Sequence, residues 1–371
     1  MEKWMTPEQR KADEEYMRMA LELAVKGKGW VAPNPMVGAV IVRDDGKVIG
    51  QGYHERYGEL HAERNALKNC LESPQGATIY VTLEPCCHHG RQPPCTEAIL
   101  EAGIRRVVVG SGDPNPLVCG KGIRILRENG VEVTEGVLKE ECDRINDIFF
   151  HYIRTKTPYV VMKYAMTLDG KIAAYTGNAR WVTGEAAREH VHRLRHELSA
   201  IMVGVGTVVA DDPMLNCRLP DTKDPLRIIC DTHLRTPLDA RVVQTAREIP
   251  TVFATCCDDT ERVMRYQEYG CRMIRVGKNG RSVDLRELMR KLGAEGIDSI
   301  LLEGGGTLNW SALNSGIVNK VMAYTAPKIF GGYSAKTPVE GDGVTTPQLA
   351  FSLKDTSVTK LGEDYLIEGK L

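Results

Sequence analysis

Residues 78–95 read TIYVTLEPCCHHGRQPPC, and this stretch decides the fold of the first half of the chain. Its first six residues are apolar, aromatic or β-branched, which predicts a strand over 78–83. A loop rich in cysteine, histidine and proline follows, and after it we expect a helix over 96–101. A strand that leads through a loop into a helix is typical of layered α/β proteins.

The sequence on both sides of this stretch continues the pattern. Apolar residues at helical spacing predict an amphipathic helix over 14–25. Extended segments at 37–42 and 47–53, joined by an Asp-Asp-Gly turn, predict a β-hairpin. The remaining expected elements are helices over 61–70 and 123–128 and strands over 106–109 and 131–134. This alternation predicts an α/β domain with a sheet that is largely parallel after its opening hairpin.

The chain of 371 residues is too long for one ordinary core, since domains usually contain about 100–200 residues. Its character changes over 149–158 (FFHYIRTKTP), and a new apolar strand begins after Pro158. We therefore expect two domains, 1–150 and 151–371. The second should repeat the α/β pattern, with strands over 159–165, 200–203, 226–230, 251–254, 272–276, 299–302 and 320–326 and helices over 184–197 and 285–292.

The triplet His61-Ala62-Glu63 and two later Pro-Cys pairs together indicate a zinc site. A catalytic zinc needs three protein ligands and an open position for water, and it lowers the pKa of that water towards neutrality. His61, Cys86 and Cys95 supply one imidazole and two thiolates. Glu63, at the start of a helix, can take the proton of the water and return it to the substrate nitrogen and the leaving amine. This set is typical of zinc-dependent deaminases of pyrimidine and adenine rings.

The spacing of the cysteines leaves the second sulfur ligand open. Zinc deaminases usually contain Pro-Cys-x-x-Cys, whereas eight residues separate Cys86 from Cys95. Cys87, His88 and His89 therefore compete as ligands. We favour Cys95, because two prolines stiffen the approach to it and the N-terminus of the next helix favours a thiolate.

The alternative to a catalytic site is a closed structural zinc site, or buried thiols without metal. A closed site would have a fourth protein ligand and would gain nothing from Glu63. Cys256, Cys257 and the remaining cysteines are interpreted as small buried hydrophobic residues.

Composition excludes several classes of protein. Lysine and arginine number 48 against 49 acidic residues, so a net charge of −1 provides no basic surface for a general nucleic-acid binder. Hydrophobic residues at 42% and charged residues at 26% are ordinary for a globular chain. No apolar run approaches the roughly 18–20 residues that a membrane span needs. Eleven cysteines without a signal peptide favour a reducing cytoplasm.

The second half indicates an anionic ligand without identifying it. The strand over 299–302 leads into Glu303 and three glycines before an expected helix. Backbone N–H groups at such a turn can bind phosphate, although the same glycines also suit a plain tight turn with positive φ. Arg195 and Arg218 are candidate phosphate ligands, but single arginines are more often solvated surface charges. The run ADDP over 210–213 also reads as a simple helix end before proline.

At these residues the chain closely resembles the bifunctional deaminase/reductase family of bacterial riboflavin biosynthesis. The matching stretches are PNPxVG over 33–38, HAE over 61–63, TLEPCCHHGRQPPC over 82–95, DPNP over 113–116, Lys163, LDG over 168–170, ADDP over 210–213 and EGGGTL over 303–308. The wide cysteine spacing is that family's own variant. The resemblance covers nearly the whole chain.

The resemblance implies a cytidine-deaminase-like three-layer domain that binds Zn²⁺, followed by a dihydrofolate-reductase-like α/β domain that binds NADPH. Glu63 would be catalytic, with His61, Cys86 and Cys95 as metal ligands. The cofactor positions would be Ala165, Trp181, Thr207, Asp211, Gly305, Gly306, Thr307, Leu308 and Asn309. The substrate positions would be Lys163, Ala179, Arg195, Leu215, Arg218 and Glu303. The family often has serine where this chain has Ala179, so one hydroxyl contact is expected to be missing.

The resemblance thus predicts an enzyme with two activities. The first domain would hydrolyse the 2-amino group of 2,5-diamino-6-ribosylamino-4(3H)-pyrimidinone 5′-phosphate. The second would reduce 5-amino-6-(5-phosphoribosylamino)uracil to the ribitylamino product with NADPH. We expect a cytoplasmic homo-oligomer that acts on these small phosphorylated substrates, without nucleic-acid or membrane partners. The alternatives are a deaminase of nucleic-acid bases, which the balanced charge disfavours, and a zinc-stabilised non-catalytic binding protein, which Glu63 disfavours.

Overall fold

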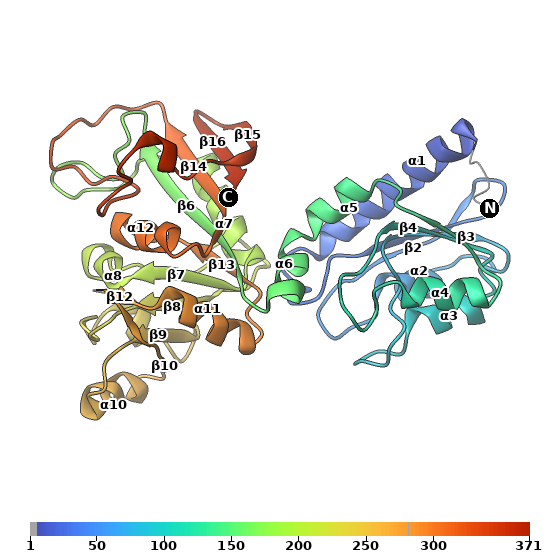
Figure 1. Ribbon diagram of the computed structural model, residues 1–371, viewed down its shortest axis with the longest axis horizontal. Coiled ribbons are helices and arrows are strands. Elements are labelled where there is room, and N and C mark those ends of the chain that lie inside the picture. Colours follow the sequence, from blue (N-terminus) through green and yellow to red (C-terminus); the bar gives the residue numbers. More distant parts are fainter. Residues whose placement is uncertain (1–5, 281) are drawn as a thin grey trace. The chain divides into compact units, whose positions relative to one another are not determined.

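The computed structural model describes residues 6–280 and 282–371 (Figure 1). Contacts divide the chain into two compact units, Met1–Thr155 and Lys156–Leu371. This division lies slightly beyond residue 150, because helix α6 (Asp147–Thr155) belongs to the first unit, where Phe149 and Phe150 pack with Leu83. Among the described residues, no helix combines the length and apolar character needed to cross a membrane.

The first unit is built on a five-stranded sheet with strand order β2-β1-β3-β4-β5. The strands are β1 (Gly38–Val42), β2 (Val48–Tyr53), β3 (Thr78–Leu83), β4 (Arg106–Ser111) and β5 (Glu132–Glu135). Strand β1 pairs antiparallel with β2 and β3, whereas β3, β4 and β5 run parallel to one another. The prediction of a largely parallel sheet after an opening hairpin is therefore confirmed.

Helices cover both faces of this sheet (Figure 1). Helices α1 (Pro7–Ala24) and α5 (Lys139–Ile145) lie on one face, and α2 (Ala62–Lys68), α3 (Cys95–Glu101) and α4 (Lys121–Glu128) lie on the other. Because successive strand residues point to opposite faces, Ile79 and Val81 pack with the second helical layer and Tyr80 packs with the first. The unit is thus the three-layer α/β domain expected from the sequence.

Helix α1 begins at Pro7, well before the expected residue 14, and a short 3₁₀ turn (Val25–Gly27) follows it. The side chain of Thr6 accepts a hydrogen bond from the backbone N–H of Gln9, and proline is favourable in the first turn. Further along, buried Asp13 pairs with Arg106 of β4 at 2.7 Å. The sequence pattern missed the first part of α1, before residue 14, because the first buried residue of the helix is the carboxylate Asp13 rather than an apolar side chain.

The second unit contains a nine-stranded sheet with order β10-β9-β8-β7-β13-β6-β14-β16-β15. All neighbours from β10 to β14 are parallel, and β16 and β15 then add an antiparallel hairpin. The strands are β6 (Tyr159–Thr167), β7 (Ala200–Gly204), β8 (Leu226–Cys230), β9 (Thr251–Thr255), β10 (Arg272–Arg275), β13 (Ser299–Leu302), β14 (Val318–Ala326), β15 (Lys354–Leu361) and β16 (Asp364–Lys370), with a separate small hairpin of β11 (Lys278–Asn279) and β12 (Ser282–Val283). The predicted strands are present, but the polar hairpin β15–β16 was not predicted.

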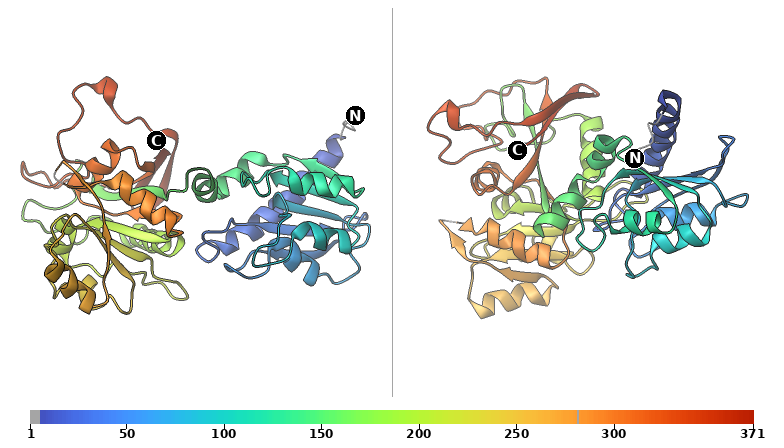
Figure 2. Two further views of the ribbon diagram at one scale, coloured as in Figure 1. Left: turned by 60° about the horizontal axis from the view of Figure 1, so that its bottom comes forward. Right: turned by 45° about the vertical axis from the view of Figure 1, so that its right-hand side comes forward.

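Helices also cover both faces of the second sheet, and Figure 2 gives two further views. One face packs against α11 (Leu285–Ala294) and α12 (Gly306–Asn314), and the other against α8 (Val205–Asp211), α9 (Arg241–Gln244) and α10 (Thr260–Glu268). Helix α7 (Glu185–Glu197) precedes β7, and a 3₁₀ turn (Pro347–Leu349) precedes β15. The predicted helices correspond to α7, α11 and, after the glycine-rich turn, α12, whereas the short helices α8, α9 and α10 were not predicted.

Candidate functional sites

The start of α2 positions two of the predicted deaminase residues. His61 is the N-cap residue of this helix, and Glu63 lies in its first turn. Glu63 is only 3% exposed, yet it lines a cavity of about 250 Å³. Burial is the main cause that raises the pKa of Glu63 above its ordinary value, and the negative charge of the nearby Cys86 thiolate raises it further. A carboxyl group in this setting is suited to accept and return a proton.

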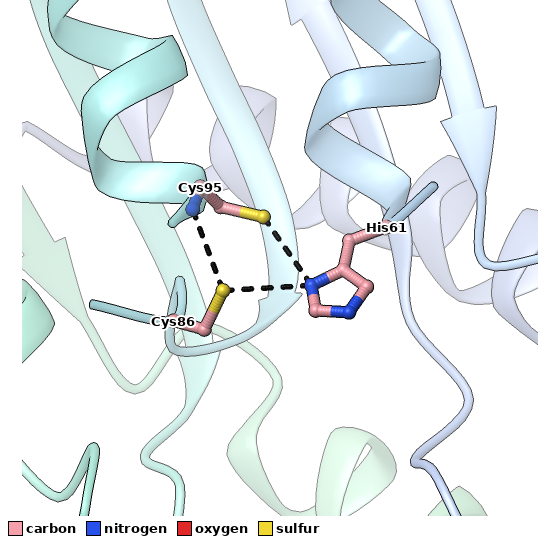
Figure 3. Close-up of side chains that lie close together, drawn as sticks. All are labelled: His61, Cys86 and Cys95. Carbon is pink, nitrogen blue, oxygen red and sulfur yellow. Dashed lines mark hydrogen bonds between the residues drawn. The ribbon is translucent and has the colours of Figure 1, made fainter. Parts of the chain in front are cut away.

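The two sulfur ligands come from the stretch that follows β3. Cys86 lies in the loop directly after the strand, and Cys95 is the first residue of α3. Their Sγ atoms lie 3.5 and 3.4 Å from Nδ1 of His61 (Figure 3). All three ligand atoms lie within 4.8 Å of one another. One imidazole nitrogen and two sulfurs form a donor set that suits a catalytic zinc, which takes three protein ligands and leaves one position for water.

The competing ligands do not join this group. Among the described residues, His61, Cys86 and Cys95 form the one cluster of this kind with metal-binding geometry. The thiol of Cys87 instead donates to the carbonyl oxygen of Leu117 at 3.7 Å. The choice of Cys95 over its neighbours therefore agrees with the geometry.

Hydrogen bonding within the group already favours one thiolate. The side chain of Cys95 and then His61 donate to Cys86, and together they hold the pKa of Cys86 well below its ordinary value, although burial opposes the change. The backbone N–H of Cys95 donates to the same sulfur at 3.4 Å. A metal ligand must be deprotonated, so this environment prepares Cys86 for metal binding.

Several residues that line this cavity had no predicted role, namely Asn34, His54, Tyr57, Arg91, Asp113 and Asn115, whereas His88 had been a competing candidate ligand. Nδ1 of His54 donates to the carbonyl oxygen of Leu60, which leaves Nε2 to accept from the amide of Asn34 at 3.2 Å. Burial lowers the pKa of His54, which agrees with a neutral ring. In the sequence, Asn34, Asp113 and Asn115 were marked only by their place in the stretches 33–38 and 113–116, and Arg91 only by the stretch 82–95. No signal marked His54 or Tyr57.

A second, larger cavity of about 780 Å³ lies in the second unit. It is lined by nearly all residues predicted for this half: Lys163, Ala165, Ala179, Trp181, Arg195, Thr207, Asp211, Leu215, Arg218, Glu303, Gly305, Gly306, Thr307 and Leu308. Asn309 is not among the lining residues, because it is fully buried and its amide donates to the carbonyl oxygen of Pro338. Asn309 was predicted to bind the cofactor, but its buried position means that it would act only through neighbouring residues.

Glu303 is the centre of a buried charged group in this cavity. Arg195 binds both of its carboxylate oxygens, at 2.8 and 3.1 Å, and Nζ of Lys163 lies 3.4 Å away. Burial alone would raise the pKa of Glu303, but the charges of Arg195 and Lys163 outweigh it and lower the pKa to about 2. The three side chains thus form a fixed ionised cluster, rather than the solvated charges considered from the sequence.

Arg218 has a different partner. Its Nη2 donates to Nε2 of His192 at 2.8 Å, so the histidine accepts there as a neutral ring. Burial, followed by the charges of Arg195 and Arg218, lowers the pKa of His192 to about 4. His192 also lines the cavity, and no sequence pattern had indicated it.

The glycine-rich turn has the form expected of a phosphate-binding segment. It connects β13 to α12, and Gly305 is the N-cap residue of that helix. A Cβ at Gly306 would lie 2.8 Å from the backbone carbonyl oxygen of Thr337, so this position requires glycine. Gly305, Gly306 and Thr307 at the start of α12 line the cavity, whose volume of about 780 Å³ suits a ligand of the size of the expected NADPH.

Comparisons with known proteins identify both domains. The model of the cytidine and deoxycytidylate deaminase zinc-binding region matches residues 10–111, and that of the RibD C-terminal domain matches residues 158–367. The riboflavin biosynthesis protein RibD of Actinobacillus pleuropneumoniae is 56% identical over 96% of this chain and 94% of its own length. RibD of Aquifex aeolicus is 43% identical over 96% and 98%.

Solved structures give the same result. The diaminohydroxyphosphoribosylaminopyrimidine deaminase/5-amino-6-(5-phosphoribosylamino)uracil reductase of Thermotoga maritima has a TM-score of 0.85 at 36% identity, covering 97% of this chain and 99% of that one. RibD of Acinetobacter baumannii has a TM-score of 0.86 at 36% identity, covering 98% and 99%. The expected fold class is thereby confirmed, and the chain belongs to the RibD family of bifunctional riboflavin-biosynthesis enzymes, which join a zinc-binding deaminase domain to a reductase domain.

Proposed function

We propose that the first unit deaminates 2,5-diamino-6-ribosylamino-4(3H)-pyrimidinone 5′-phosphate and that the second reduces the resulting 5-amino-6-(5-phosphoribosylamino)uracil. The observation that carries this proposal is the donor set of His61, Cys86 and Cys95 beside buried Glu63 at one cavity. The names of the structural relatives provide the substrate pair.

In the first step, water replaces the 2-amino group and ammonia leaves. Zinc held by the three ligands supplies a Lewis acid that lowers the pKa of water. Glu63 accepts one proton of the attacking water and passes it to the ring nitrogen, and it then takes the second proton of that water and passes it to the departing amine. Burial favours this exchange, because the raised pKa of Glu63 makes its carboxylate a stronger base and brings that pKa closer to neutrality.

In the second step, NADPH supplies a hydride to C1′ of the ribose, and a proton completes the opened ribityl chain. We assign Ala165, Trp181, Thr207, Asp211 and the segment 305–308 to the cofactor, with Asn309 supporting that segment from behind. The substrate is assigned to Lys163, Ala179, Arg195, Leu215, Arg218 and Glu303. These groups bind and orient the substrate, with Arg218 placed at its phosphate, and orientation accounts for much of the expected rate gain.

One assay tests both parts of the proposal. The purified zinc-loaded chain is incubated with the diaminopyrimidine substrate, and ammonia release and NADPH oxidation are followed together. We expect one ammonia to be released and one NADPH to be consumed per substrate. Absence of ammonia release contradicts the proposed deaminase, and ammonia release without NADPH oxidation contradicts the proposed reductase.

Two expectations about the whole protein remain proposals. We propose a homo-oligomer, because β15 forms an open sheet edge and the β15–β16 hairpin exposes Val358, Tyr365 and Ile367. Light scattering at several concentrations tests this state. We also propose a cytoplasmic location with small-molecule substrates and no nucleic-acid or membrane partner, and fractionation of the source cells tests it.

A further inference from the structure

Glu84, between strand β3 and the metal ligand Cys86, has an unusual set of partners. Its side chain is buried, with the residue only 4% exposed. Oε2 accepts hydrogen bonds from the backbone N–H groups of Gly120 at 3.0 Å and Asp113 at 3.4 Å. Oε1 accepts from Gly122 at 3.1 Å and Ile123 at 3.4 Å. One carboxylate therefore holds four donors from a segment about 30–40 residues further along the chain.

These donors belong to one structural element. Gly120 is the N-cap residue of α4, and Gly122 and Ile123 lie in its first turn. The first N–H groups of a helix lack partners within the helix, and the positive end of the helix dipole favours a carboxylate there. Glu84, which directly follows β3, thus caps α4 from a distant part of the chain.

The capped segment forms a wall of the deaminase cavity. Asp113, Asn115 and Val118 line that cavity, on the segment just before α4. The segment is folded locally, because the carboxylate of Asp113 accepts from the N–H of Asn115 at 2.8 Å. The N–H of Asp113 itself is bonded to Glu84, so the same carboxylate fixes both ends of the wall.

Glu84 is also close to the metal ligands along the chain. Only Pro85 separates it from Cys86. A Cβ at Gly122 would lie 2.2 Å from the carbonyl oxygen of Pro85, so the first turn of α4 packs directly on this peptide. Glu84 and Pro85 therefore join the ligand Cys86 to the wall that carries Asp113.

We propose that Glu84 is a positioning residue of the deaminase, which sets the distance between the metal-ligand loop and the wall of residues 113–118 that contacts the pyrimidine substrate. Glu84 itself also lines the cavity, but both of its carboxylate oxygens are occupied by these backbone bonds, and it acts through them. The inference rests on the proposed deaminase function, and it adds a determinant of substrate binding within that site.

The substitution Glu84→Gln tests this inference. The amide keeps the shape but replaces one acceptor oxygen with a donor group, so two of the four N–H groups lose their partner. We expect zinc content to remain at one per chain, because His61, Cys86 and Cys95 are unchanged. The deaminase KM should rise about 10- to 100-fold, as is usual when support behind a site is removed, with a smaller change in kcat.

Two further measurements do not depend on deaminase turnover. Amide hydrogen exchange should become at least about tenfold faster at two or more of Asp113, Gly120, Gly122 and Ile123. The NADPH-dependent reductase of the same chain should keep its activity, since its cavity lies in the other unit. If Glu84→Gln does not yield soluble protein, Glu84→Asp keeps the charge but shortens the reach, and the same results are expected of it.

The matched control is Glu128→Gln, which removes an exposed carboxylate from the other end of α4. It should behave like the unsubstituted chain in every assay. Loss of zinc from Glu84→Gln, an unchanged deaminase KM, unchanged hydrogen exchange or a parallel loss of reductase activity would each overturn the inference. If the unsubstituted chain releases no ammonia, the proposed function fails, whereas hydrogen exchange and zinc content still decide whether Glu84 holds the wall.

Discussion

The backbone N–H of Cys95 donates to Sγ of Cys86 across 3.4 Å, although nine positions separate the two residues in the chain. Cys95 thus supplies one sulfur of the metal site and, through the N-terminus of α3, stabilises the other as a thiolate. The loop between them brings both sulfurs to His61, as the close-up shows (Figure 3). This geometry leads to the first two predictions.

Substitution Glu63→Gln should abolish deamination while zinc stays bound. The amide cannot accept the proton of the attacking water, and loss of general acid–base catalysis alone costs about 10²–10⁴ in rate. Ammonia release and metal content are measured on the same sample. Near-normal turnover of the variant would contradict the assigned proton transfer.

Zinc binding should be lost in Cys95→Ser and kept in Cys87→Ser. Cys95 lies 3.4 Å from Nδ1 of His61, whereas the thiol of Cys87 points to the carbonyl oxygen of Leu117. Metal analysis after dialysis decides between them. A depleted Cys87→Ser variant beside a loaded Cys95→Ser variant would show that the ligands are assigned wrongly.

A fragment of residues 1–155 should fold and bind one zinc without reductase activity. The first unit has its own core on both faces of its sheet, and all three ligands lie within it. The fragment should extend to Thr155, because Phe149 and Phe150 of α6 pack against Leu83. Circular dichroism and metal analysis check the result, and an unfolded fragment would mean that the second unit stabilises the first.

Substitution Arg218→Ala should weaken binding of the phosphorylated substrate selectively. A charge-assisted bond to phosphate is worth about 1.5–3 kcal/mol, so the reductase KM should rise roughly 10- to 150-fold. A dephosphorylated substrate should show a much smaller effect, and the affinity for NADPH should hardly change. Equal effects on both substrates would mean that Arg218 does not contact the phosphate.

Arg195→Ala provides the contrast, since Arg195 already pairs with Glu303 through two hydrogen bonds. Its removal leaves a buried carboxylate with only Lys163 as a cation, and this penalises both substrates. Sequence analysis assigned the same role to both arginines. The two substitutions should nevertheless differ, because only Arg218→Ala should raise the reductase KM selectively for the phosphorylated substrate.

The stability of the second unit should depend on pH through Glu303. Its pKa is about 2 in the folded chain against an ordinary 4.5, so the ionised form stabilises the fold above about pH 4.5, and this contribution is lost as the pH falls towards 2. The shift corresponds to about 3 kcal/mol at neutral pH. Urea unfolding of the unsubstituted chain and of Glu303→Gln should differ most at pH 7 and much less at pH 3. If the difference in free energy of unfolding between the two proteins were the same at pH 7 and pH 3, the ion pairs of Glu303 would not be the cause of the pH dependence.

The sequence alone determined the elements whose information is local. Apolar periodicity located most strands and the main helices, and the residue types in HAE, EPC and PC identified zinc chemistry before any distance was known. It also indicated Cys95 as the first residue of a helix, which the structure confirms. These predictions succeeded because period, capping and ligand chemistry depend on neighbours in the chain.

Tertiary structure decided which distant side chains meet and what charge each one carries there. The sequence missed the polar first turns of α1, because burial of Asp13 depends on Arg106, 93 positions away. It presented Arg195 and Glu303 as separate candidates, whereas the fold pairs them across 108 positions and removes Arg195 as a free cation. Only the fold buries Glu63 and carries Glu84 to the start of α4. Desolvation and pairing act through space, so they set the pKa values and the walls of both cavities only once the chain has folded.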